Sequence, residues 1–169
     1  MFDKLNTPEE IFSFKLGSAL SMENTVLDTL GEMQAKTNRD EIRQLLDQHA
    51  AETRQHIANI EQAFTLLDEK VDDSPCPAMD GIQKEGKATL KKLDDSLLDA
   101  GILAGAIETE HYEIAVYEIL VTNAEARGAM DVAALLRRNL EDEQRTLEQV
   151  KTVAERIAKQ DGWAVSVAT

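Results

Sequence analysis

Carboxylate side chains interrupt the apolar faces of four predicted helices, once near the middle of each. The residues are Glu23, Glu52, Glu110 and Glu143. In each segment apolar residues recur three or four positions apart, so a polar residue in the same row faces the interior of the bundle. An ionised carboxylate buried there is costly unless it is paired or bound to a metal. These positions therefore predict a site that holds cations.

The four glutamates are also predicted to lie at one level. Each helical residue advances about 1.5 Å, so residues equidistant from a tight turn lie side by side in an antiparallel pair. The midpoint of positions 23 and 52 falls at Thr37-Asn38, and that of positions 110 and 143 falls beside Arg127-Gly128. Both places are breaks in the helical pattern. Carboxylates gathered at one height repel one another unless protons or metal ions neutralise them.

Three more side chains are candidate ligands of the same centre. Glu113 lies one helical turn beyond Glu110 and can reach the same point. His49 and His56 flank Glu52 at three and four positions, and each is either a ligand or a histidine of the core. Oxygen-rich ligands with imidazole suit iron or manganese. We expect two divalent metal ions, with iron first and manganese as the alternative.

The elements that position these residues are helices. Thr7 and Glu10 form a capping box with Pro8 at the first helical position, and Asn38 with Glu41 gives a second start signal of this type. The predicted helices span residues 8–36, 39–70, 79–91, 95–126 and 129–159, with a proline-containing loop at 72–77. Two tight hairpins joined by a long connection predict an all-α, ferritin-like four-helix bundle, whose crossover contains a short extra helix. We expect one domain over residues 1–160 and a loose C-terminal tail over 161–169.

Composition excludes other classes of function. The chain has 169 residues and a formal net charge of −14, which repels nucleic-acid backbones. Apolar runs are too short for a membrane span, and the first residues lack the features of a signal peptide. The single cysteine, Cys76, fits a reducing compartment. We therefore expect a cytoplasmic protein without nucleic-acid or membrane partners.

Apolar residues away from the core rows predict self-association, most simply as a homodimer. Phe12 and Phe14 lie on different sides of the first helix, and Ile102 and Val116 lie off the main row of the fourth. A second apolar face commonly marks a partner. In the alternative, the crossover segment containing Met79 and Ile82 covers that face.

Short motifs along nearly the whole chain resemble one known family. They are Ser21-Met22-Glu23, His49-Ala50-Ala51-Glu52-Thr53, Cys76-Pro77-Ala78-Met79-Asp80-Gly81, Glu110-His111-Tyr112-Glu113-Ile114-Ala115 and Leu140-Glu141-Asp142-Glu143. In this order and spacing they resemble the YciE/YciF-type ferritin-like stress proteins of bacteria. The resemblance implies a rubrerythrin-like di-metal bundle, commonly dimeric, whose inward acids match Glu23, Glu52, Glu110, Glu113 and Glu143.

The sequence departs from the wider ferritin-like pattern in one respect. That pattern places histidine three residues after glutamate on two helices, whereas here Gln55 follows Glu52 and Thr146 follows Glu143. We therefore expect a metal-binding stress-response protein with a carboxylate-rich di-iron or di-manganese site. If it is an enzyme, it is a di-metal oxidoreductase acting on oxygen or peroxide as a small-molecule oxidant. The alternative is a non-catalytic structural or partner-binding bundle with a vestigial site.

Overall fold

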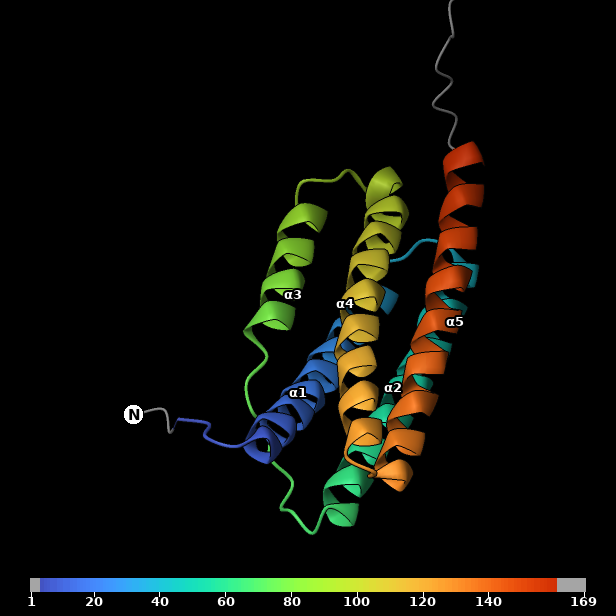
Figure 1. Cartoon of the computed structure of the whole chain (residues 1–169). Helices are drawn as coiled ribbons and strands as arrows, with labels where there is room; N and C mark the ends of the chain where they lie inside the picture. Colours follow the sequence, from blue (N-terminus) through green and yellow to red (C-terminus); the bar gives the residue numbers. More distant parts are fainter. Residues whose placement is uncertain (1–3, 161–169) are drawn as a thin grey trace, which may run out of the picture.

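Two antiparallel helical hairpins form the body of the protein in a computed structural model, which describes residues 4–160 (Figure 1). The elements are α1 (Pro8–Gln34), α2 (Asp40–Leu66), α3 (Pro77–Leu90), the 3-10 turn η1 (Asp95–Leu97), α4 (Leu98–Ala126) and α5 (Met130–Gln160). Helices α1 and α2 make one hairpin, and α4 and α5 make the other. The short helix α3 lies on the crossover and packs against α1 and α4. This all-α, ferritin-like bundle with one crossover confirms the predicted fold. The predicted tail, 161–169, lies outside the described residues.

The first helix begins as its sequence predicts. The Glu10 amide donates to the Thr7 hydroxyl, and the Glu10 carboxylate accepts from the Thr7 amide at 3.2 Å, which completes the capping box. The second start signal is wrong. Arg39, not Asn38, precedes α2, and no side chain caps that helix. The Asn38 side chain instead donates to the Asp95 carbonyl at 3.0 Å, and its backbone amide donates to the Asp99 carboxylate.

The turn between α1 and α2 is thereby tied to the second hairpin. The buried Thr37 hydroxyl also donates to Asp99, at 2.7 Å, and Asp99 lies in the first turn of α4. Hydrogen bonds to a charged acceptor are stronger than neutral ones. They fix the height of α4 relative to α1 and α2, and hence the level at which side chains of the two hairpins meet.

Close backbone approaches hold α3 at both of its ends. A Cβ atom at Gly17 of α1 would lie 2.9 Å from the Asp72 carbonyl oxygen, so the loop before α3 lies directly on α1. Ser18 and Ser21 donate to carbonyls of the same loop. A Cβ atom at Gly101 of α4 would clash with the side chain of Leu93, just beyond the C-terminal end of α3. Glycine at these two positions permits the contacts.

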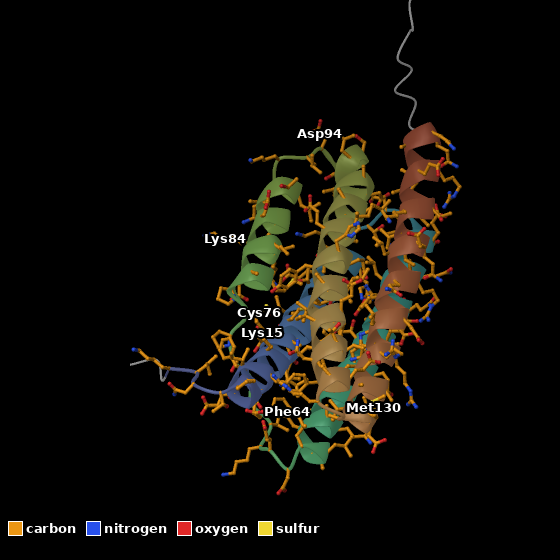
Figure 2. All side chains as sticks on the ribbon, in the orientation of Figure 1. Lys15, Phe64, Cys76, Lys84, Asp94 and Met130 are labelled. Carbon is orange, nitrogen blue, oxygen red and sulfur yellow. The ribbon has the colours of Figure 1, made fainter. Side chains whose placement is uncertain are left out.

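A sharp turn closes the second hairpin. Gly128 has a φ of 76°, which suits glycine at the residue that ends a helix. Arg127, at the same turn, donates to the Pro8 carbonyl at 2.9 Å and lies over the Phe12 ring. The start of α1 and the end of α4 therefore meet at one end of the bundle. Figure 2 shows Met130, the first residue of α5, at that end as well.

The apolar residues that motivated a dimer have different surroundings. Phe12 and Ile102 are buried within the same chain, Met79 of α3 is buried, and Ile82 packs against the core. Phe14 is exposed, together with Ile11, Leu66, Ile119 and Met130, near the end of the bundle just described. The dimer stays a prediction, now motivated by this end. No helix within residues 4–160 has the length and apolar character of a membrane span.

Candidate metal centre

Six of the predicted ligands are buried at mid-bundle. The exposed fraction is 0% for Glu23, Glu110, Glu113, Glu143 and His56, and 4% for His49. Glu23 belongs to α1, the histidines to α2, Glu110 and Glu113 to α4, and Glu143 to α5. Each long helix therefore contributes at least one ionisable side chain to the same region of the core.

These side chains form two groups that share Glu143. One group contains His49, Glu110, Glu113 and Glu143, and the other contains Glu23, His56 and Glu143. Within each group one donor atom per residue lies within 4.8 Å of all the others. A carboxylate has two oxygens and can bind two cations at once. The geometry thus offers two neighbouring cation positions with Glu143 between them.

The two histidines lie on either side of Glu143. His56 Nδ1 is 2.9 Å from one Glu143 oxygen, and His49 Nε2 is 3.5 Å from the other. His49 Nδ1 is 3.2 Å from Glu110, and His56 Nδ1 is also 3.6 Å from Glu23. These are ion-pair distances, but the nitrogens facing Glu143 lack hydrogen-bond geometry. The rings are close enough to share a metal ion with the carboxylates.

Burial sets the charge of the metal-free site. Burial and the Glu143 carboxylate raise the pKa of Glu110 to about 11, and burial raises the pKa of Glu113 well above its usual value. The pKa of Glu23 is also raised, chiefly by burial. Burial opposes ionisation of Glu143 too, but contacts with His49 and His56 outweigh it and lower its pKa to about 2. Glu110 and Glu113 therefore keep their protons at neutral pH in the metal-free site, which lowers the negative charge that cations would otherwise balance.

The donor atoms of this site fit a metal. Buried polar atoms in proteins almost always have hydrogen-bond partners, and exceptions point to strain, function or an ion. Here both carboxylate oxygens of Glu110, Glu113 and Glu143 are buried without one. One oxygen of Glu23 and the nitrogens His49 Nε2 and His56 Nδ1 are in the same state. Carboxylate and imidazole donors converging in this way can hold divalent cations such as iron or manganese.

Glu52 lies outside both groups. It remains 18% exposed and accepts from Arg145 at 2.8 Å, from Thr146 at 3.2 Å and from Gln48. The fully buried residue at this height of α2 is its neighbour, Thr53. Successive helical residues differ by about 100° in direction, so positions 52 and 53 lie equally far, on opposite sides, from the row through His49 and His56. The packing of α2 in the bundle turns Thr53 inward and leaves Glu52 at the edge. The sequence row through Glu52 followed the edge of this face.

Polar side chains around the site hold its ligands in place. Tyr117 donates to Glu23, and the Tyr117 oxygen accepts from Asn139 at 3.0 Å. Asp142 Oδ2 lies 3.4 Å from His56 Nε2, on the side of the ring that faces away from Glu143. Arg145 links Asp142 to Glu52. Such outer contacts orient metal ligands.

The spacing of residues along the helices indicates part of this surrounding set. Asn139 stands in the same row as Glu143, and this row was its signal. Tyr117 lies in the inward row of α4 that contains Glu110 and Glu113, so its position in the row is likewise a signal. Asp142 had no signal, because it precedes Glu143 by one residue and reaches His56 from the side of the row.

The chain also resembles known proteins along most of its length. The family model described as a domain of unknown function, DUF892, matches residues 7–162. Protein YciF of Escherichia coli K12 is 31% identical over 144 residues, which cover 84% of this chain and 87% of that protein.

Solved structures give the same picture. The crystal structure of the E. coli stress protein YciF has a TM-score of 0.87 and 29% identity, covering 92% of this chain and 99% of that one. YcfI from Rhodopseudomonas palustris, provisionally described as a structural protein, has a TM-score of 0.86 and 32% identity, with 90% and 98% covered. A protein from Xanthomonas campestris, 22% identical with a TM-score of 0.72, covers 90% and 94% and shares the fold.

Proposed function

Because this chain belongs to the DUF892 family and is similar to a bacterial stress protein, we propose that it is a metal-binding stress-response protein with a di-iron or di-manganese centre at mid-bundle. The observation that carries the proposal is the set of buried carboxylate oxygens without hydrogen-bond partners. Leaving such groups without partners costs free energy. Two divalent cations would provide the carboxylate oxygens with contacts and would neutralise the repulsion between the carboxylates.

Each group of side chains would hold one cation. His49, Glu110 and Glu113 would bind the first and Glu23 and His56 the second, with Glu143 shared. The bound metals would supply Lewis-acid and redox chemistry toward oxygen or peroxide. The chain's own contribution is to orient the ligands, through Tyr117 at Glu23 and through Asp142 at His56, and to exclude bulk water by burial. On the grounds of its composition we place the protein in the cytoplasm.

Metal content decides this proposal. Protein purified without added metal or chelator should contain iron or manganese, and anaerobic titration with ferrous iron should reach about two equivalents per chain, one for each side-chain group. Glu143→Gln should lower the metal occupancy of both positions together, because both groups of ligands contain Glu143. Glu141→Gln is the matched control, since Glu141 lies on the same helix and is exposed.

The alternative function is a non-catalytic structural or partner-binding bundle. It is favoured by the description of YcfI and by the raised pKa values that let Glu110 and Glu113 remain protonated without metal. Purified protein without bound metal, and without uptake of ferrous or manganous ions at millimolar concentration, would establish this alternative and overturn the di-metal proposal.

A further inference from the structure

A small cavity reaches the candidate metal centre from the side covered by α3. Its volume is about 20 Å³, which is room for one water-sized molecule. Donor residues of the centre, His49 and Glu110, form one wall. Much of the remaining wall is apolar and comes from α1, α3 and α4, through Val26, Leu30, Met33, Met79 and Ala106. The cavity thus opens on the group of ligands that contains His49, Glu110 and Glu113.

A second cavity lies beside the first, between α3, α1 and α4. It also has a volume of about 20 Å³ and shares four lining residues with the inner one, so the two are adjacent. The shared residues are Thr29, Met33, Gln83 and Thr109. The outer cavity is also lined by Glu32 and Lys87, whose exposed side chains form an ion pair at 2.8 Å. The two cavities therefore lie between this exposed ion pair and the ligands His49 and Glu110.

A hydrogen bond lies where the two cavities adjoin, and two glycines line the outer cavity. The Gln83 amide donates to the Thr29 hydroxyl at 2.7 Å, between the roof α3 and the wall α1. Gly86 and Gly105 line the outer cavity from α3 and α4. A Cβ atom at Gly86 would meet nothing within 4 Å, and one at Gly105 would meet only the end of Met33, at 3.8 Å. Side chains placed at these two positions would therefore extend into unfilled space.

We propose that the two cavities form a passage through which small uncharged molecules of the size of dioxygen reach the metal centre. The inference rests on the proposed metal-binding function. The size of each cavity excludes larger organic molecules, and an ion would have to lose its water shell among methionine, valine and leucine side chains. A small uncharged molecule pays no such desolvation cost. Gln83 and Met33 stand at the junction of the cavities and control transit.

Leucine at either glycine tests the passage without disturbing the ligands. Gly105→Leu fills the outer cavity from α4, and Gly86→Leu fills it from α3. Gly31→Leu is the control, because Gly31 lies on α1 in an exposed position with nothing within 4 Å. Each change replaces a helical glycine by a better helix former, so stability should be maintained. The probe is nitric oxide, a small uncharged molecule, whose binding to the ferrous-loaded protein is followed anaerobically by stopped-flow absorbance.

Both cavity-filling variants should bind the same amount of iron as the wild type but bind nitric oxide about tenfold more slowly, while Gly31→Leu keeps the wild-type rate. Equal iron content with unchanged rates in all variants would overturn the passage and leave the metal proposal standing. Absence of iron uptake would overturn the metal proposal instead. In that case the cavities are tested in metal-free protein by xenon, which should shift the methyl resonances of Met33 and Met79 in the wild type but not in Gly105→Leu. Absence of a shift in the wild type would refute the passage independently.

Discussion

Glu110→Gln should stabilise the metal-free protein at neutral pH although it removes a candidate metal ligand. Glu110 is fully buried, and burial with the nearby Glu143 raises its pKa from 4.5 to about 11. At pH 7 the folded protein therefore keeps a proton on this group, whereas the unfolded chain has released it. Glutamine has a similar shape and has no proton to release.

The size of the effect follows from the difference in bound protons. Between the two pKa values the folded state binds one more proton, so each pH unit lowers the free energy of unfolding by about 1.4 kcal/mol. The contribution of Glu110 is complete below pH 4.5 and is lost as the pH rises toward 11. At pH 7 the loss is about 3 kcal/mol. Because glutamine also alters the 3.2 Å contact with His49, we expect a net gain of about 1–3 kcal/mol.

Urea unfolding of chelator-treated protein at about pH 5.5, 6.5 and 7.5 measures this prediction. The variant's advantage over the wild type should grow by about 1.4 kcal/mol per pH unit. Glu108→Gln, an exposed change on the same helix, should give no such trend. If Glu110→Gln were less stable than the wild type by a constant amount, Glu110 would be ionised and paired in the folded protein, and the reasoning would be refuted.

Three further predictions concern the metal response, the surroundings of the site and assembly. Metal at 100 times its dissociation constant should stabilise the folded protein by about 2.7 kcal/mol and raise its melting temperature. This rise should disappear in Glu143→Gln but largely persist in Glu52→Gln. If both variants lost it equally, Glu52 would be among the ligands. Tyr117→Phe removes the hydroxyl that links Glu23 to Asn139 and should cost about 1 kcal/mol in urea unfolding, whereas no loss would show that water replaces it. The homodimer predicts a concentration-dependent sedimentation coefficient, and a single species near 18.7 kDa at all concentrations would contradict it.

The sequence predicted the arrangement of helices well because local signals and long-range geometry agreed. Glycine, proline and capping residues marked the hairpins, and equidistance from the turns placed Glu23, Glu110 and Glu143 at one level. Asn38 was wrongly predicted to cap α2, because an asparagine side chain can either cap a helix or form a hydrogen bond with a distant part of the chain. Its side-chain amide donates to the carbonyl of Asp95, some sixty positions away, and no local sequence pattern reveals that contact.

The site was predictable to the extent that its members share a row. His49 and His56 emerged because their spacing follows the buried face of α2, and Glu113 because it follows Glu110 by one turn. Glu52 shows the limit of this approach. Whether a residue at the edge of a row faces the core or a neighbouring helix depends on the angle at which the helices pack. Here the Glu52 carboxylate faces α5, where Arg145 and Thr146 donate to it.

The contacts at Gly17 and Gly101 also determine how the roof over the site can move. The loop before α3 contacts α1 at Gly17, and Leu93, just after α3, contacts α4 at Gly101. The helix is therefore held at both ends. Contacts at both ends oppose the hinge motion of a lid, which takes microseconds to milliseconds. The passage of small molecules beneath α3 then depends on rotamer changes of side chains such as Met33 and Gln83. Such changes occur in picoseconds to nanoseconds when unhindered. Small molecules would therefore reach the centre without a rearrangement of α3, and selectivity would depend on the space that these side chains leave between them.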